Sequence, residues 1–158
     1  MISILALCTG NASRSILAEA IFNRDGAGRV RAFSAGSNPV GVVAGATLDC
    51  LAARGIDSKG LRSKSWFEFS GSGAPQLDIV LDLCPSVAAE RHPAWQGRPV
   101  TATWAMDEPL AAPTEQTAVA FALAYHRLSA RINAALALPL EHLGRDELAG
   151  HLDRIGRG

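Results

Sequence analysis

Short apolar runs alternate along the chain with longer segments whose apolar residues recur at helical spacing. The short runs predict buried strands over residues 2–7, 30–34, 77–83 and 100–104. The longer segments predict helices over residues 15–23, 42–54, 114–138 and 146–155. This alternation predicts an α/β fold in which helices cover both faces of a parallel sheet.

Between the second predicted helix and the third predicted strand, the chain has no clear periodicity. Residues 55–76 are rich in Gly, Ser and Pro and contain an aromatic cluster at residues 66–69, and they predict mostly loop around a short helix. No internal repeat, linker or low-complexity tract interrupts the chain. We therefore expect residues 1–158 to form a single domain.

The composition is typical of a globular protein and narrows the range of partners. Apolar residues make up 48% of the chain, and 15 Lys and Arg residues balance 15 Asp and Glu residues. A net charge of zero argues against nucleic acid or an anionic membrane as a partner. Residues 1–64 carry eight basic and four acidic side chains, a net charge of +4, which favours an anion site nearer the N-terminus.

Cysteine and histidine usage excludes several classes of site. The three cysteines and four histidines have neither zinc-site spacing nor the density of a disulfide scaffold, so we expect no metal. No apolar run reaches the roughly 18–20 residues of a membrane helix. The N-terminal residues also lack the features of a signal peptide. We therefore expect a cytoplasmic protein with reduced thiols.

Reactive side chains follow three of the four predicted strands. Cys8 follows the first strand, Cys84 the third, and the pair Asp107 and Glu108 follows the fourth. Because right-handed crossovers bring the carboxyl ends of parallel strands to one edge of the sheet, these side chains are expected to lie together. The sequence therefore predicts a reactive site at that edge.

The segment from Cys8 to Ser15 contains a cysteine, five residues, an arginine and a serine, between a strand and a helix. Such a loop directs backbone N–H groups and the positive end of the helix at an anion. Arg14 can grip an oxyanion with two parallel hydrogen bonds, and the same positive field favours the thiolate of Cys8. We expect the oxyanion to be bound by the loop residues Thr9, Gly10, Asn11, Ala12, Ser13 and Arg14.

The alternative is a buried cysteine in an ordinary turn with an exposed arginine, since a bare cysteine–arginine spacing is frequent by chance. The position of the loop between a strand and a helix favours the anion site. So do the pair Gly10 and Asn11, which tolerate left-handed conformations, and Ser15, which can donate to the thiolate.

The segment CTGNASRSILAEA resembles the anion loop and first helix of the low-molecular-weight protein tyrosine phosphatase superfamily. The remaining matches follow the order of its arsenate reductase branch: SAGS at 34–37, GID at 55–57, RSKSW at 62–66, and the C-terminal AYHRLSARI, LPLEHL and LDRIG. The resemblance spans nearly the whole chain. It implies a four-stranded parallel sheet in the order 2-1-3-4, with Cys8 as the nucleophile and Arg14 as the anion clamp.

The sequence departs from the family pattern at the general acid. In the family this acid is an aspartate directly before the proline of an Asp-Pro loop. Here Glu108 holds that place and Asp107 precedes it, so either carboxyl group is a candidate, and the place before Pro109 favours Glu108. The aromatic residue that follows this pair in tyrosine phosphatases is Leu110 in this chain.

A second departure concerns the cysteines after the third strand, of which the thioredoxin-coupled reductases carry two. Cys84 matches the first of them, but His92 stands where the second is expected. We expect His92 to be an inactive loop residue and Cys50, in a predicted helix beside leucines, to belong to the core.

A third departure concerns potassium. Asn11, Glu19 and Ser34 match residues that bind a structural potassium ion in some related reductases. The aspartate that completes that site is replaced here by Ser65, so the ligand set is incomplete.

The resemblance and the loop together favour arsenate reduction. Cys8 would attack arsenate held by the loop and Arg14, while Asp107 or Glu108 protonates the departing oxygen. Cys84 would then release arsenite by forming a disulfide with Cys8. In the order 2-1-3-4 the strands before these cysteines are neighbours, about 4.8 Å apart, which suits a disulfide after a small loop movement.

Two other functions remain open at this point. A phosphatase would use the same first step on phosphotyrosine or a small phosphoester, and water would complete the reaction without Cys84. A non-catalytic anion-binding module is disfavoured because Cys8, Arg14, Ser15 and Cys84 are all present. We expect no tightly bound cofactor. An external reductant would reopen the disulfide: glutathione with glutaredoxin, another small thiol, or thioredoxin.

Overall fold

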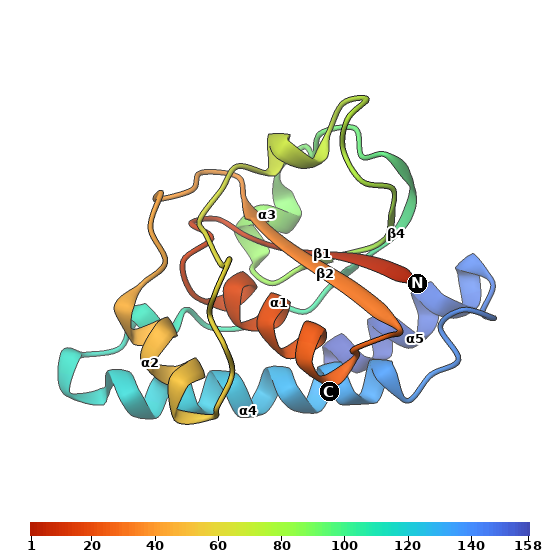
Figure 1. Ribbon diagram of the computed structural model, residues 1–158. Helices are drawn as coiled ribbons and strands as arrows, with labels where there is room; N and C mark the ends of the chain where they lie inside the picture. Colours follow the sequence, from red (N-terminus) through yellow and green to blue (C-terminus); the bar gives the residue numbers. More distant parts are fainter.

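The computed structural model describes residues 1–158 and contains one sheet of four parallel strands, in the order β2-β1-β3-β4 (Figure 1). The strands are β1 (Ile2–Cys8), β2 (Val30–Gly36), β3 (Leu77–Asp82) and β4 (Gly97–Thr103). The helices are α1 (Arg14–Asp25), α2 (Gly45–Ala53), α3 (Pro85–Ala89), α4 (Thr117–Leu136) and α5 (Arg145–Arg157). The predicted α/β class and strand order are confirmed.

The two faces of the sheet are buried by different elements. Along β1, Ile4 and Ala6 belong to the larger apolar cluster, while Leu5 and Leu7 belong to the smaller one. This is the alternation expected of a strand covered on both faces. Helices α1, α4 and α5 cover the first face and α3 lies against the second (Figure 1). None of the helices is at once long enough and apolar enough to cross a bilayer.

The fourth strand begins at Gly97 rather than residue 100, and the helices differ from the predicted ones in three respects. The second helix begins at Gly45 rather than residue 42, because residues 37–44 run along the loop after β1 and bond to its carbonyl oxygens. The long C-terminal helix is preceded by a 3₁₀ turn at Thr114–Gln116, and α4 itself begins at Thr117. Helix α3 is absent from the prediction, because five residues are too short to show a helical period.

Backbone pairing continues past the strand ends and brings the three reactive segments together. Leu83 N donates to Leu7 O (2.8 Å), so β1 and β3 stay paired up to their cysteines. After β4, Met106 N donates to Leu83 O (3.1 Å), which draws the following segment across the end of β3. The predicted edge of the sheet therefore carries all three groups.

Candidate active site

The loop between β1 and α1 is held by its carbonyl groups, which leaves its N–H groups free. Asn38 N donates to Thr9 O (2.9 Å), Val40 N to Gly10 O (3.0 Å) and Ala44 N to Ala12 O (3.2 Å). The backbone N–H groups of residues 9–13 have no hydrogen-bond partner within the protein. A run of unpaired N–H groups at a helix N-terminus is a cradle for an anion.

Asn11 supplies the bend in this loop. Its φ of 48° is the only positive value at a non-glycine residue, whereas Gly10, which the sequence also suggested for this role, has no positive φ. Asn11 adopts the left-handed region because its side chain is bonded locally. Gly36 permits the close approach of β2, since a Cβ there would lie 2.4 Å from Thr9 O.

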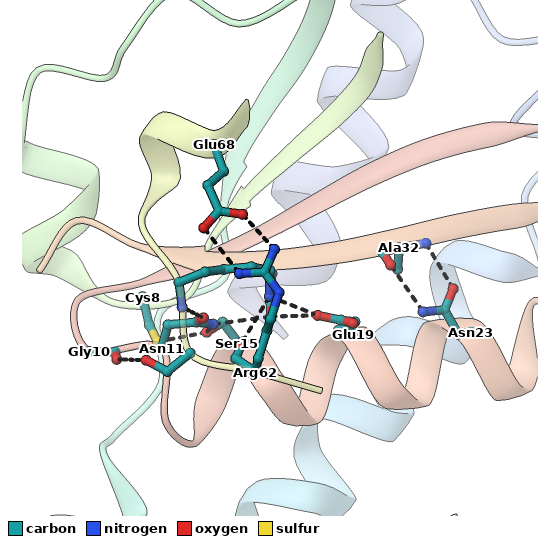
Figure 2. Close-up of polar contacts among 12 residues, drawn as sticks. Cys8, Gly10, Asn11, Ser15, Glu19, Asn23, Ala32, Arg62 and Glu68 are labelled. Carbon is teal, nitrogen blue, oxygen red and sulfur yellow. Dashed lines mark hydrogen bonds and ion pairs between the residues drawn. The ribbon is translucent and has the colours of Figure 1, made fainter. Parts of the chain in front are cut away.

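Cys8 and Ser15 form the buried centre of the site. Cys8 is 1% exposed, and its Sγ lies 2.9 Å from the Oγ of Ser15 on the first turn of α1. Asn11 Nδ2 donates to the same Oγ (2.7 Å), so the hydroxyl proton of Ser15 is free to point at the sulfur. Figure 2 shows Asn11 and Ser15 beside Cys8. The expected donation from Ser15 to the thiolate is geometrically available.

Arg14 lies at the N-terminus of α1 with a largely buried guanidinium. Its Nη1 donates to Met106 O (3.0 Å) and its Nη2 lies 3.3 Å from Glu108 Oε2. The buried Nε has no hydrogen-bond partner. A buried donor without a partner is costly unless a ligand supplies the acceptor, so Arg14 retains a hydrogen bond for an oxyanion.

The two carboxyl groups that follow β4, those of Asp107 and Glu108, differ in position. Glu108 Oε1 accepts hydrogen bonds from Ser13 Oγ (2.6 Å) and Leu110 N (3.0 Å), while Oε2 faces Arg14. Asp107 is exposed and makes no hydrogen bond. The structure thus brings Glu108, and not Asp107, to the mouth of the loop.

Cys84 lies at the end of β3 and is 2% exposed. Its Sγ is 3.6 Å from Thr9 Oγ1 and 3.3 Å from Ser86 Oγ. Burial disfavours the thiolate, but hydrogen bonds from Ser86, Thr9 and the Val87 N–H, with the charge of Arg14, outweigh it and lower the pKa of Cys84. Cys84 therefore combines contact with the anion loop and an environment that favours the reactive thiolate.

Cys50 differs from the other two cysteines in both position and environment. It lies in α2, within the larger apolar cluster, and its nearest polar partner is Phe121 O at 3.8 Å. Burial raises the pKa of its thiol against the opposing charge of Arg54. The expectation that Cys50 belongs to the core is confirmed.

His92 lies in the loop after α3, as expected, and contacts the end of β3, which the sequence did not predict. Its Nε2 lies 3.3 Å from Asp82 Oδ1 and 3.2 Å from Val87 O, and its ring packs edge-on to Trp66. Burial raises the pKa of Asp82 to about 6, and the charge of His92 opposes this rise. Sequence reasoning missed Asp82, although a carboxylate between the apolar residues Leu81 and Leu83 was a usable signal.

Lys64 is the other charged residue that sequence reasoning missed. It is 8% exposed, and its Nζ lies 3.7 Å from Glu19 Oε1 on α1. A lysine is almost never buried without a partner. Its place in the polar segment RSKSW gave no sign of this burial, because neither an apolar period nor a turn motif includes it.

Solved structures with the same fold include arsenate reductases and a tyrosine phosphatase. An arsenate reductase in the phosphate binding state is 23% identical, with a TM-score of 0.69 over 87% of this chain and 98% of its own. Arsenate reductase from Archaeoglobus fulgidus DSM 4304 is 22% identical, with a TM-score of 0.63 over 82% and 98%. Low molecular weight protein tyrosine phosphatase from T. tengcongensis is 25% identical, with a TM-score of 0.62 over 84% and 96%. These likenesses do not distinguish the two activities.

Sequence comparison gives the family directly. No curated protein matches the chain significantly. A family model described as low molecular weight phosphotyrosine protein phosphatase matches residues 3–147, which include the anion loop, Cys84 and Glu108. Since the match covers most of the sequence, the chain belongs to the low molecular weight phosphotyrosine protein phosphatase family.

Proposed function

We propose that this protein is an arsenate reductase in which Cys8 is the nucleophile and Cys84 the resolving thiol. The Cys8 thiolate attacks arsenate that is held by the N–H groups of the loop and by Arg14. A sulfur–arsenic bond forms, an arsenic–oxygen bond breaks, and the hydroxyl leaves as water with a proton from Glu108. The product is an arsenic(V) adduct on Cys8.

In the second step the thiolate of Cys84 attacks Sγ of Cys8. A disulfide forms and the sulfur–arsenic bond breaks, with its electron pair remaining on arsenic. The two cysteines lose two electrons, and arsenic(V) becomes arsenic(III), which leaves as arsenite. No other oxidant or reductant enters this half of the cycle.

The observation that carries the proposal is the environment of Cys84. A phosphatase has no use for a second thiol, whereas here Cys84 contacts the loop residue Thr9 and has a lowered pKa. The paired ends of β1 and β3 keep the two cysteines on neighbouring strands. These features are those required of a thiol that must reach Cys8 by a small loop movement.

The return half of the cycle needs an external thiol reductant. His92 stands where a third cysteine would act, and Cys50 is buried in α2 with a raised pKa. Neither can open a Cys8–Cys84 disulfide. We therefore propose that two thiol equivalents come from outside: glutathione with glutaredoxin, another small thiol, or thioredoxin.

A phosphatase is the second candidate. Cys8, Arg14 and Glu108 supply the nucleophile, clamp and acid that a phosphocysteine mechanism uses, and this half of the site is complete without Cys84. Against a phosphotyrosine substrate, Leu110 follows Pro109 where tyrosine phosphatases carry an aromatic residue.

Two assays on wild type and on Cys84→Ser separate the candidates. The reductase account predicts arsenite formation with at least one thiol reductant, and loss of steady turnover in Cys84→Ser. Release of nitrophenol from p-nitrophenyl phosphate should persist in that variant, since phosphate transfer needs only Cys8. Cys50→Ser is the matched control and should keep both activities. Phosphatase turnover without any arsenite production would establish the second candidate instead.

A further inference from the structure

A buried ammonium group, that of Lys64, belongs to a segment that pairs with the end of β2, whereas Cys84 follows β3 on the other side of β1. Lys64 Nζ donates to Arg62 O (2.9 Å) and lies 3.7 Å from Glu19 Oε1. The main chain of Lys64 is also bound to the loop, because its N–H donates to Asn11 Oδ1 (2.9 Å) and its carbonyl accepts from Gly36 N (2.9 Å). The residue is therefore fixed at both ends.

From Glu19 a chain of hydrogen bonds leads to the nucleophile. Ser34 Oγ donates to Glu19 Oε1 (2.6 Å), and Asn11 Nδ2 donates to both Ser34 Oγ (3.0 Å) and Ser15 Oγ (2.7 Å). Ser15 Oγ in turn lies 2.9 Å from Cys8 Sγ. Figure 2 shows this line of contacts, with Glu19 at one end, Asn11 and Ser15 in the middle and Cys8 at the other.

Lys64 is the counterion of Glu19. The nearby cation Arg62 is already paired by two hydrogen bonds with Glu68, to the side of the network (Figure 2). Burial lowers the pKa of Lys64, Arg62 adds to this effect, and Glu19 and Glu68 oppose it. Removing one partner of a buried pair leaves an uncompensated charge, so Glu19 depends on Lys64 for its position.

The residues around Glu19 do not fit a potassium ion. Potassium needs free oxygen lone pairs, but Ser34 Oγ accepts a hydrogen bond from Asn11 Nδ2, and Glu19 Oε1 accepts one from Ser34. Asn11 presents its NH₂ group, which has no lone pair to offer, to both serines. The oxygen of Asn11 is taken by the Lys64 N–H, and the Ser65 hydroxyl accepts from Phe67 N within its own turn. The ammonium group itself lies against the carboxylate that would have to bind the ion.

We propose that Lys64 is a built-in cation that positions the nucleophile. By holding Glu19 it keeps Ser34, Asn11 and Ser15 aligned, so that the Ser15 proton points at Cys8, and the site works without a bound monovalent cation. This inference rests on the proposed function only in that Cys8 is the nucleophile, and it holds for a reductase and for a phosphatase.

The test is the rate of alkylation of Cys8 by iodoacetamide as a function of pH, which requires no substrate. In Lys64→Gln we expect the profile to move to higher pH and the rate at pH 7 to fall about tenfold, as expected for loss of roughly 1.4 kcal/mol. Phosphate protection of Cys8 should change less than about twofold, because the loop N–H groups and Arg14 remain. Lys59→Gln, at the only other lysine and an exposed one, is the matched control.

Two results would overturn the inference. One is a Lys64→Gln profile identical to that of Lys59→Gln; the other is equal loss of alkylation and phosphate protection, which would indicate a collapsed loop. A further experiment uses the wild-type protein alone, so it does not depend on the folding of a variant. Its alkylation rate should be the same in potassium, sodium and choline chloride at equal ionic strength, and a several-fold acceleration by potassium alone would contradict a built-in cation.

Discussion

The surroundings of Cys8 and Cys84 differ although both thiols are buried at the ends of neighbouring parallel strands. Cys8 is followed by the anion loop, whose carbonyl groups accept hydrogen bonds from residues 37–44, and then by the 12-residue helix α1. Ser15, the side-chain partner of Cys8, belongs to a hydrogen-bond network that ends at the ion pair of Glu19 with Lys64. Cys84 is followed by the five-residue helix α3, and its Sγ contacts the hydroxyls of Thr9 and Ser86 and the N–H of Val87.

This difference indicates which cysteine moves. Opening the Cys8 loop would break many buried hydrogen bonds, whereas moving Cys84 breaks its hydrogen bonds with Thr9, Ser86 and the Val87 N–H and disturbs one short helix. Segments with few buried contacts open at the lowest free-energy cost. We infer that the Cys8 side binds and activates the anion as a rigid cradle, and that the Cys84 side supplies the movement that makes the disulfide.

The largest expected effect comes from Arg14 on the rigid side. Arg14→Lys keeps the charge but loses the planar fork, including the buried Nε that has no partner within the protein. By analogy with arginine clamps on phosphoryl groups, we expect turnover to fall about 10³-fold or more. Arg127→Lys, on an exposed face of α4, is the control.

Steady-state kinetics with arsenate or with p-nitrophenyl phosphate measure the effect. If phosphate protected Cys8 from alkylation equally well in wild type and in Arg14→Lys, Arg14 would not belong to the anion site.

A smaller effect should separate the two carboxyl groups beside the cradle. Glu108 contacts Ser13 and Arg14, whereas Asp107 is exposed. Loss of a general acid costs roughly 10²–10⁴-fold. We therefore expect Glu108→Gln to lower kcat at least about 10²-fold and Asp107→Asn to leave it nearly unchanged. The reverse order would assign the acid to Asp107, and two rates close to wild type would show that this segment does not supply it.

The smallest expected effect is on stability and concerns Asp82, which lies at the end of β3 two residues before Cys84. The pKa of Asp82 is raised to about 6 from an ordinary value of 3.8, so between these values the folded state binds more protons than the unfolded state. The free energy of unfolding must then fall as pH rises through this window, by at most about 3 kcal/mol.

Urea unfolding between pH 4 and 7 measures this dependence. Asp82→Asn should flatten the fall and be more stable than wild type at pH 7, because no carboxylate is buried in the variant. Asp78→Asn, at an exposed position on the same strand, should keep the wild-type slope. A wild-type stability that rises over this range relative to Asp82→Asn would show that burial does not disfavour the charged form of Asp82.

The local sequence pattern predicts most of the fold, and it predicts the parts of the site that contain Cys8 and Cys84. The apolar run before Cys8 and the loop through Ser15 predict a strand, a turn and an anion cradle, because each depends on neighbours in sequence. The same holds for Cys84 at the end of β3. Helix boundaries at Gly45 and Thr117 differ from the prediction because tertiary contacts of the preceding residues decide them.

The remaining features depend on contacts between distant segments. Lys64 meets Glu19, and His92 meets Asp82, only because loops return to the sheet edge. Glu108 and Asp107 are adjacent in sequence, yet only Glu108 faces Ser13 and Arg14. The place of Glu108 directly before Pro109 favours it in the sequence, but its contacts depend on the direction of the chain after β4, which no local pattern predicts.

The most direct test of the account is a single turnover of the reduced protein with arsenate, followed by alkylation after unfolding and mass mapping. The account predicts a disulfide between Cys8 and Cys84, with Cys50 alkylated and one arsenite released per protein. In Cys84→Ser the same reaction should release no arsenite without an added thiol. A disulfide that includes Cys50, or full multiple turnover in Cys84→Ser, would contradict the division of labour between Cys8 and Cys84.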